Sequence, residues 1–389
     1  MIKRLLKEQK KSFLLLGPRG TGKSTWLRDS YPKSLFIDLL ESERFLELHT
    51  SPQKLRELVR HLEPKTWVVI DEIQKVPNLL SEVHQIYETQ KLNFALSGSS
   101  ARKLRAGGAD LLAGRALQTF LFPLVHSEYS EHLTLDEAIN WGTLPSIVME
   151  KEFRERTLTT YVQTYLKEEI LSESLVRKLD PFTRFLRVAG QRNGQLLNTE
   201  NIARESSVKR TTADHYFGIL EDTLLGYQLP ALRRGYKKKE VAHSKFYFFD
   251  AGVARAAAGL VREQVDGLWL GFALETLILN EIKAYNSYSE KERPLYHYSV
   301  TGGYDIDFVI ETKLKTYSQP GELLCIEAKL SKTWNPKWCD PMLDFKGLTK
   351  SKVKGLYGLY LGKDRRTIRG VEILPIPVFL KMLYKGEIF

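Results

Sequence analysis

Short apolar runs alternate with amphipathic stretches along the first 125 residues of the chain. Each run has the length of a short buried strand, and segments with helical spacing lie between the runs. The apolar runs fall at residues 13–16, 35–38, 67–70, 93–96 and 117–122. Strands that alternate with helices favour a parallel sheet with helices on its faces. The pattern therefore predicts an α/β domain over residues 1–125.

The pattern becomes helical after this domain, and we expect residues 126–178 to form a small helical lid. Residues 179–235 have the spacing of a winged helix-turn-helix. The helices expected in this unit cover residues 182–191, 200–205 and 209–224. Lys209 and Arg210 begin the last helix, where a recognition helix contacts DNA. The basic run at residues 233–239 is a candidate wing or backbone-binding strap.

Residues 236–389 form the fourth expected unit, which combines a buried helix with amphipathic strands. Apolar residues at spacings of three and four run from Leu268 to Ile282, with Glu275 inside the stripe and Glu281 outside it. Strands are expected at residues 304–310 and 324–329. A carboxylate on a buried helix face needs a partner, so Glu275 becomes a candidate functional residue.

The phosphate-binding loop is the strongest motif in the chain. Residues 17–24 match the pattern G-x-x-x-x-G-K-[ST] between an apolar strand and a helix. Backbone N–H groups of such a loop cradle phosphates, Lys23 adds a positive charge, and the Ser24 hydroxyl can bind magnesium. The residues expected to hold the nucleotide are Gly17, Pro18, Arg19, Gly20, Thr21, Gly22, Lys23, Ser24 and Thr25. The loop predicts a site for ATP with Mg²⁺.

A Walker B pattern supplies the acidic groups that hydrolysis needs. The apolar strand at 67–70 ends in Asp71 and Glu72. We expect Asp71 to hold magnesium through water and Glu72 to act as the general base. The next strand ends before Ser97 and Ser99, and either serine could lie between the γ-phosphate and the attacking water.

Arg115 stands just before the last expected strand of the ATPase domain. An arginine at this point is placed to reach the nucleotide of a neighbouring subunit and act as an arginine finger. The alternative is an ordinary surface arginine in a loop. The finger interpretation implies an oligomer.

The acidic residues of the last unit follow the order of a PD-(D/E)xK nuclease site. A period of two places Asp307 and Val309 on one face of the first strand and Ile306 on the other. Glu327 and Lys329 share a face of the next strand. The alternative is two amphipathic strands with solvated charges.

In the nuclease interpretation, carboxylate oxygens are hard ligands for a divalent cation. Asp307, Glu327 and Glu275 would then bind a second Mg²⁺ or Mn²⁺, while Lys329 orients water or stabilises the charged transition state. A nuclease-like fold that binds DNA without cutting it is a further possibility.

Charge is distributed unevenly along the chain. The chain has 58 basic and 47 acidic residues, a net charge of +11. Residues 1–150 hold 20 basic and 18 acidic residues, and the remainder holds 38 and 29. The basic excess in the C-terminal part favours a phosphate-rich partner such as DNA, and its alternative is charge that serves solubility.

Other features of composition favour a cytoplasmic protein. No apolar run reaches the length of a membrane helix, and the basic segment 1–11 lacks the apolar core of a signal peptide. The two cysteines, Cys325 and Cys339, form no metal-ligand spacing or disulfide framework, which fits a reducing compartment. We expect no membrane partner.

Together these motifs resemble one family, the prokaryotic AAA-type ATPases with a C-terminal nuclease-like domain of unknown function. The motifs that carry the resemblance lie at residues 17–24, 71–72, 97–100, 112–115, 122–124, 142–145, 161–170, 247–252, 271–275, 305–308 and 326–329. The resemblance implies an α/β fold: a P-loop AAA+ ATPase parallel sheet with a helical lid, a winged helix-turn-helix and a restriction-endonuclease-like domain. It also implies ATP with magnesium and a homo-oligomer such as a ring.

These observations favour an ATP-hydrolysing AAA+ protein that binds and remodels DNA, branched DNA included. The alternative is a nucleotide-controlled regulatory or defence switch with slow turnover and a C-terminal domain that binds without cutting. A protein remodeller ranks lowest, because the chain shows no aromatic pore loop.

Overall fold

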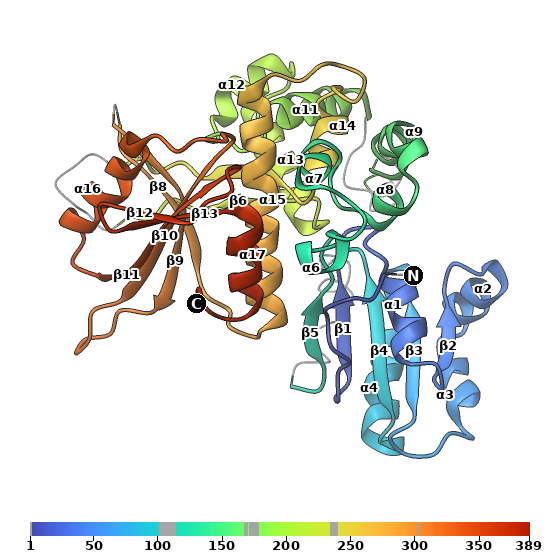
Figure 1. Cartoon of the computed structure of the whole chain (residues 1–389). Helices are drawn as coiled ribbons and strands as arrows, with labels where there is room; N and C mark the ends of the chain where they lie inside the picture. Colours follow the sequence, from blue (N-terminus) through green and yellow to red (C-terminus); the bar gives the residue numbers. More distant parts are fainter. Residues whose placement is uncertain (1, 101–113, 167–169, 171–178, 234–239, 302) are drawn as a thin grey trace.

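The computed structural model describes residues 2–100, 114–166, 170, 179–233, 240–301 and 303–389 (Figure 1). Its N-terminal part contains a five-stranded sheet in the order β2-β3-β4-β1-β5, and every neighbouring pair is parallel. The strands are β1 (Phe13–Leu16), β2 (Leu35–Asp38), β3 (Trp67–Asp71), β4 (Asn93–Gly98) and β5 (Leu117–Phe120). The expected parallel α/β sheet is confirmed, and β4 lies between the two strands that carry the nucleotide motifs.

Helices cover both faces of this sheet. They are α1 (Lys23–Ser30), α2 (Ser42–Thr50), α3 (Lys54–Val59) and α4 (Leu79–Gln90), with the 3₁₀ turn η1 (Ile73–Lys75). Phe13 and Leu15 of β1 pack with Trp26 and Leu27 of α1 on one face. Residues of α2, α3 and α4 form a second cluster on the other face. Both faces of the inner strands β1, β3 and β4 are therefore largely buried, which explains their continuous apolar runs.

A group of short helices follows the N-terminal sheet. They are α6 (His126–Tyr129), α7 (Leu135–Trp141), α8 (Pro145–Met149), η3 (Lys151–Phe153), α9 (Arg154–Thr160) and the π-helical segment η4 (Tyr161–Leu166). Thr134 caps α7 and forms a capping box with Glu137. Their role as a lid remains a prediction.

The next elements are α11 (Leu179–Gln191), α12 (Thr199–Glu205), α13 (Arg210–Asp222), β6 (Gly226–Leu229) and β7 (Lys245–Phe248). The side chain of Asn198 accepts a hydrogen bond from Asn201 N and so caps α12. The two strands pair antiparallel, on either side of the domain boundary expected at residue 235. Of the candidate wing, residues 234–239 lie outside the described residues. The winged helix-turn-helix remains a prediction.

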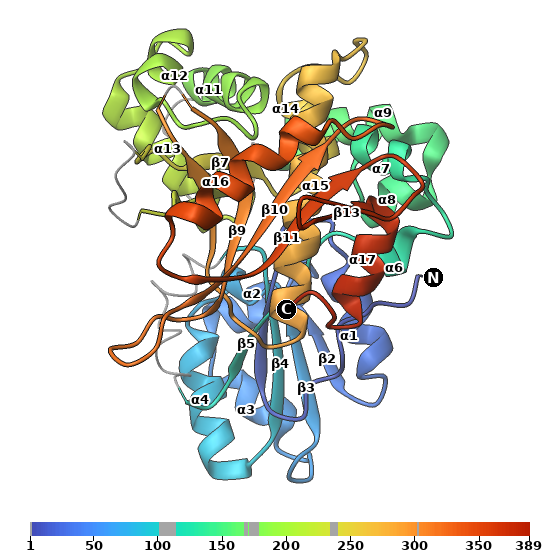
Figure 2. The same cartoon turned by 60° about the vertical axis from the view of Figure 1, so that its left-hand side comes forward.

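The C-terminal part contains a six-stranded mixed sheet in the order β12-β13-β11-β10-β9-β8. Its strands are β8 (Leu295–Ser299), β9 (Asp305–Lys313), β10 (Glu322–Lys329), β11 (Lys352–Tyr360), β12 (Arg366–Ile368) and β13 (Val371–Pro375). The accompanying helices are α14 (Ala251–Ala257), α15 (Gly267–Tyr288), η5 (Pro336–Cys339), α16 (Asp340–Leu348) and α17 (Ile376–Tyr384). α15 and α17 pack on one face, and α16 packs on the other (Figure 2).

The long helix α15 lies between the two sheets (Figure 1). It contacts β10 of the C-terminal sheet and β5 of the N-terminal sheet. Glu281 is only 1% exposed within this helix, so the expectation that it lies outside the buried stripe was wrong. A helix covered on several sides buries positions that a single stripe leaves out.

A β-bulge interrupts β9 at Asp307. Tyr298 pairs with Ile306 and Tyr296 pairs with Val309, so two residues of β9 stand opposite one residue of β8. Ile306 and Val309 consequently pack in the same apolar cluster, against the alternation expected from a period of two. The bulge adds Asp307 to the strand and changes the direction of the residues around it.

Candidate ATP-binding site and C-terminal carboxylate cluster

The phosphate-binding loop joins β1 to α1 and depends on its glycines. Gly20 and Gly22 have φ of 82° and 89°, in the left-handed region that favours glycine. A Cβ at Gly17 would lie 2.4 Å from the carbonyl oxygen of Leu121. Lys23 Nζ donates to the carbonyls of Gly17 at 2.8 Å and Pro18 at 3.1 Å. The lysine is thus folded back along the loop that it would share with a nucleotide.

The Walker B acids lie at the carboxyl edge of the same sheet. Ser97, on the intervening strand β4, donates to Asp71 Oδ1 and accepts from Glu72 N at 3.1 Å. Gln74 Nε2 donates both to Glu72 Oε2 and to Ser99 Oγ. Ser97 therefore contacts the acidic pair directly, whereas Ser99 reaches it through Gln74.

The residues of this edge fit a magnesium ion. Asp71 is fully buried, and its Oδ2 has no hydrogen-bond partner among the described residues. A buried carboxylate oxygen without a hydrogen-bond donor destabilises the fold unless a cation, or a water bound to a cation, contacts it. Mg²⁺ bound through one carboxylate, a hydroxyl and several waters is the usual arrangement at triphosphate sites. Ser24 and Asp71 are the residues that would hold it.

Residues distant in the sequence contact the phosphate-binding loop from outside the sheet. Tyr161 is buried, and its hydroxyl donates to the carbonyl of Arg19 at 2.9 Å. Pro145 lies on the same side, since a Cβ placed at Gly22 would be 3.8 Å from its Cγ. The helical segment after the ATPase sheet therefore packs directly on the loop.

Arg4 links the loop to the body of the protein. Its Nη1 donates to the carbonyl of Thr21 at 2.6 Å and its Nη2 to the carbonyl of Phe122 at 2.7 Å. Its Nε lies 3.1 Å from Glu128 Oε2, and both side chains are buried. Phe122 N in turn donates to the hydroxyl of Tyr288, at the end of α15. One partly buried network thus joins the loop to the helix between the two sheets.

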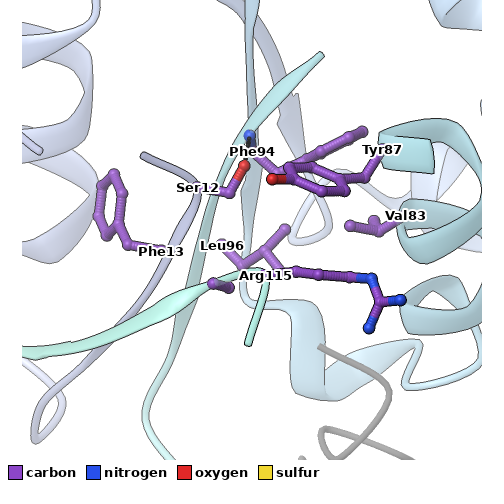
Figure 3. Close-up of a pocket in the computed structure, with 8 residues that line it drawn as sticks. Ser12, Phe13, Val83, Tyr87, Phe94, Leu96 and Arg115 are labelled. Carbon is purple, nitrogen blue, oxygen red and sulfur yellow. Dashed lines mark hydrogen bonds between the residues drawn. The ribbon is translucent and has the colours of Figure 1, made fainter. Parts of the chain in front are cut away.

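Arg115 lies at the opposite, amino edge of the sheet, just before β5. Its Nε is 2.6 Å from Glu88 Oε1 of α4. It also lines a cavity of about 10 Å³ between β1, β4 and α4 (Figure 3). This space suits at most one water molecule. The arginine is therefore remote from the phosphate-binding loop of its own chain.

The structure brings together the carboxyl groups of the predicted nuclease site. Asp307 N donates to Glu327 Oε2 at 3.3 Å, and Ala328 N donates to Asp307 Oδ2 at 2.9 Å. Lys329 Nζ forms an ion pair with Glu327 Oε1. Glu275 of α15 is buried beside this group. We refer to Glu275, Asp307 and Glu327 as the carboxylate cluster.

A lysine from β7 enters the cluster. Lys245 Nζ lies 3.3 Å from Glu275 Oε2 and 3.6 Å from Asp307 Oδ1. Burial alone would lower the pKa of Lys245, but the charges of Glu275 and Asp307 outweigh it and raise that pKa. The hydroxyl of Tyr247 donates to Glu275 Oε2 at 2.6 Å. Burial, followed by the charge of Asp307, raises the pKa of Glu275 to about 7 and that of Glu327 to about 8.

The cluster does not fit a divalent cation in the way that the Walker edge does. Among the described residues, no group of three or more His, Cys, Asp or Glu side chains is arranged to hold a metal. The Lys245 ammonium lies where a cation would contact Glu275 and Asp307. Backbone N–H groups donate hydrogen bonds to further carboxyl oxygens of Asp307 and Glu327, and Lys329 forms an ion pair with Glu327. These contacts support no metal-dependent step at the carboxylate cluster.

Sequence reasoning missed several of these residues. Arg4 and Lys245 carried no motif, and Pro145 and Tyr161 stood in motifs without an assigned role. A signal existed for Lys245, because it is the polar residue that opens the aromatic strand β7. A buried lysine of this kind needs a carboxylate partner.

Three family models match consecutive parts of the chain. Residues 9–130 match an AAA domain. Residues 132–264 and 270–379 match two domains of unknown function, DUF8612 and DUF4143. The N-terminal part is therefore a P-loop ATPase domain of the AAA type.

Similar proteins are known in bacteria. An uncharacterized protein of Haemophilus influenzae is 25% identical over 63% of this chain and 69% of its own length. An uncharacterized protein of Mycobacterium tuberculosis is 23% identical over 78% of this chain and 68% of its own length.

Two solved structures show weaker likeness. The Aeropyrum pernix ORC1 protein in complex with DNA is 13% identical, with a TM-score of 0.31 over 69% of this chain and 87% of that chain. A STAND signal-transduction ATPase with a tetratricopeptide repeat sensor from Pyrococcus horikoshii is 13% identical, with a TM-score of 0.22 over 75% and 49%. Scores this low establish no shared fold. In the part of this chain that the structure describes, no helix has both the length and the apolar character needed to cross a membrane.

Proposed function

We propose that the protein hydrolyses ATP and uses the energy to bind and remodel DNA, branched DNA included. The observation that carries the hydrolytic part is the contact of Ser97 with both Asp71 and Glu72. This contact fixes the acidic pair beside the phosphate-binding loop. The remaining steps follow from what each residue can do.

Lys23 exchanges its loop carbonyls for phosphate oxygens when ATP enters, because an ammonium group prefers the anionic acceptor. Magnesium, when bound, supplies positive charge to the β- and γ-phosphates. Glu72 accepts the proton of the attacking water as general base. Ser97 positions Asp71 and Glu72 through its two hydrogen bonds. Ser99 supports Glu72 indirectly, because Gln74 donates to both residues.

Arg115 is proposed to complete the site of a neighbouring subunit. Its place at the amino edge of the sheet, far from its own loop, supports action in trans. The guanidinium would leave Glu88, an exposed partner, when subunits assemble. Exposed ion pairs of this kind contribute little to stability because solvent screens them, so the loss of this pair costs little. The assembly would be a homo-oligomer such as a ring.

DNA binding is proposed for the basic C-terminal part. Lys209 and Arg210 are exposed at the start of α13, and Arg204 is exposed on the preceding helix. Contacts of such residues with phosphates release counterions, so affinity should fall steeply with salt. The winged and nuclease-like units would together hold a duplex or a branch point.

ATP turnover and DNA binding test this proposal together. Turnover of the wild type and of Glu72→Gln is measured without DNA, with linear duplex and with a four-way junction, and the same samples are examined for cleavage on a gel. DNA should stimulate the wild type and leave Glu72→Gln inactive. Lys209→Ala with Arg210→Ala should weaken DNA binding, with exposed Lys33→Ala as the matched control. Binding that does not change with salt would remove the DNA proposal.

A nucleotide-controlled switch is the second candidate. It is favoured by the contacts that Tyr161 and Arg4 make with loop carbonyls, because they couple other segments to nucleotide occupancy. A switch would turn over slowly and rearrange on binding ATP. Strong stimulation of turnover by DNA argues against it, and a nucleotide-dependent change in hydrogen exchange without such stimulation supports it.

A further inference from the structure

We propose that Lys245 takes the place of a divalent cation in the carboxylate cluster, so that the C-terminal domain holds its nuclease-like site closed without metal. The proposal is independent of the ATPase and DNA functions proposed above. It assigns a chemical role to a residue that belongs to β7, outside the strands and helix that carry the cluster.

The position of the ammonium group is the first observation. Lys245 Nζ lies between Glu275 Oε2 at 3.3 Å and Asp307 Oδ1 at 3.6 Å. The side chains of all three residues are buried. A cation that bridged these two carboxylates would have to occupy the space that the ammonium fills.

The hydrogen bonds of the cluster are the second observation. Glu275 Oε2 accepts from Tyr247, and Asp307 Oδ2 accepts from Ala328 N. Glu327 offers one oxygen to Asp307 N and the other to Lys329. Magnesium requires oxygen ligands in near-octahedral geometry at about 2.0–2.1 Å. Oxygens already engaged by donors on a rigid sheet are poorly placed to provide it.

The charge of the cluster is the third observation. Two lysines, Lys245 and Lys329, face three buried carboxyl groups. Buried carboxylates persist only when they are paired or protonated. Two ammonium groups supply the same positive charge as one divalent cation. The lysines therefore neutralise the site to the extent that a metal would.

The strand that carries Lys245 cannot easily withdraw it. Lys245 pairs with Leu229 of β6, and an isolated bridge joins it to Leu196 on its other side. Phe246 and Phe248 of β7 are fully buried in the main core. The backbone of Lys245 is therefore held on both sides, and only rotation of its side chain could move the ammonium. That side chain is 6% exposed and lies among packed residues, so rotation would have to displace its neighbours.

Manganese binding tests the proposal. The Asp71→Asn background weakens the Walker site, and Mn²⁺ bound per chain is counted by electron paramagnetic resonance at millimolar Mn²⁺. In Asp71→Asn, with Lys245 intact, we expect no ion in the carboxylate cluster. Neither Mn²⁺ nor EDTA should shift the melting temperature of this protein. Adding Lys245→Ala should create one Mn²⁺ site that Glu327→Gln removes. Lys332→Ala, a nearby exposed lysine, is the matched control and should bind none.

Metal binding to the cluster while Lys245 is present is the result that would overturn the proposal. An ion bound in Asp71→Asn with Lys245 intact, and lost on adding Glu327→Gln, overturns the proposal. This comparison does not need the Lys245 variant to fold. Metal binding of that kind would leave the ATPase and DNA proposals unaffected, because they depend on other residues.

Discussion

Arg4 donates a 2.6 Å hydrogen bond to the backbone carbonyl of Thr21, so the segment before the first strand holds the phosphate-binding loop from outside. The same guanidinium lies 3.1 Å from Glu128. An arginine suits this position because its planar donors can serve several acceptors at fixed angles. The loop is therefore supported by a residue that is not part of the nucleotide motif.

Replacement of Arg4 by alanine should destabilise the protein strongly. The change leaves the buried carboxylate of Glu128 without its cation, and breaking a buried pair in this way costs about 3–5 kcal/mol. Urea unfolding of Arg4→Ala measures the loss. Lys3→Ala, an exposed neighbour, should unfold like the wild type. A loss below about 1 kcal/mol would be typical of a surface pair and would contradict the buried linkage.

Tyr161→Phe should loosen the cover over the phosphate-binding loop. The variant lacks the hydroxyl that donates to the Arg19 carbonyl at 2.9 Å. A hydrogen bond of this kind contributes about 0.5–1.5 kcal/mol. Its loss should therefore raise the rate constant of nucleotide association by up to about tenfold. Stopped-flow binding of a fluorescent ADP analogue measures the rate. Tyr317→Phe alters an exposed tyrosine and serves as the control. Equal association rates for all three proteins would show that the contact does not restrain the loop.

Gly142→Ala should disrupt the junction between the helical segment and β7. A Cβ at Gly142 would lie 2.0 Å from Asp250 Oδ1, and the φ of 76° is already unfavourable for alanine. The Asp250 carboxylate cannot retreat freely, because it caps α14 and accepts from Thr143 N. We expect a loss of more than about 2 kcal/mol in unfolding free energy.

Gly218→Ala provides the matched comparison for Gly142. Gly218 lies inside α13, and a Cβ there meets no atom within 4 Å. Alanine should stabilise this helix by about 0.5–1 kcal/mol. Calorimetry of both variants should shift the melting temperature in opposite directions. Two shifts of the same sign would contradict the packing described for Gly142.

Glu281→Gln should remove a pH dependence of stability. Burial raises the pKa of Glu281 from 4.5 to about 8, despite hydrogen bonds from Tyr384 and His126 N that lower it. The folded state thus binds the proton more tightly than the unfolded state. The resulting stability is complete below 4.5 and is lost as the pH rises through about 8. Glutamine stays neutral, so its urea midpoint should change less across this window. Parallel curves for the two proteins would refute the assignment.

Local motifs made the ATPase domain predictable from sequence. The expected strands at 13–16 and 35–38 coincide with β1 and β2, and β3 and β4 start at the expected residues. Continuous apolar runs and a contiguous phosphate loop encode these features within a few residues. The different contacts of Ser97 and Ser99 were not predictable, because they depend on neighbours from another strand and a turn: Ser97 donates to Asp71, and Ser99 contacts Gln74.

Long-range contacts explain what sequence reasoning missed. Tyr161 meets Arg19 across 142 residues, and Lys245 meets Glu275 across 30. The hydrophobic periodicity of a sequence does not indicate such contacts between distant residues. The bulge at Asp307 is one inserted residue, which alternation cannot reveal. Glu281 was wrongly placed outside the buried stripe because α15 is covered on several sides rather than on one.

The origin of Lys245 on β7 has a consequence for how this architecture can be divided. A fragment that begins at residue 270, where one family match starts, would contain the whole carboxylate cluster but neither Lys245 nor Tyr247. Its carboxyl groups would then lose the partners that accompany them in the intact chain. The residues that neutralise these carboxyl groups therefore extend beyond the segment that the family model matches. Exchange of C-terminal domains between relatives should succeed only when the exchanged segment includes the antiparallel pair β6 and β7.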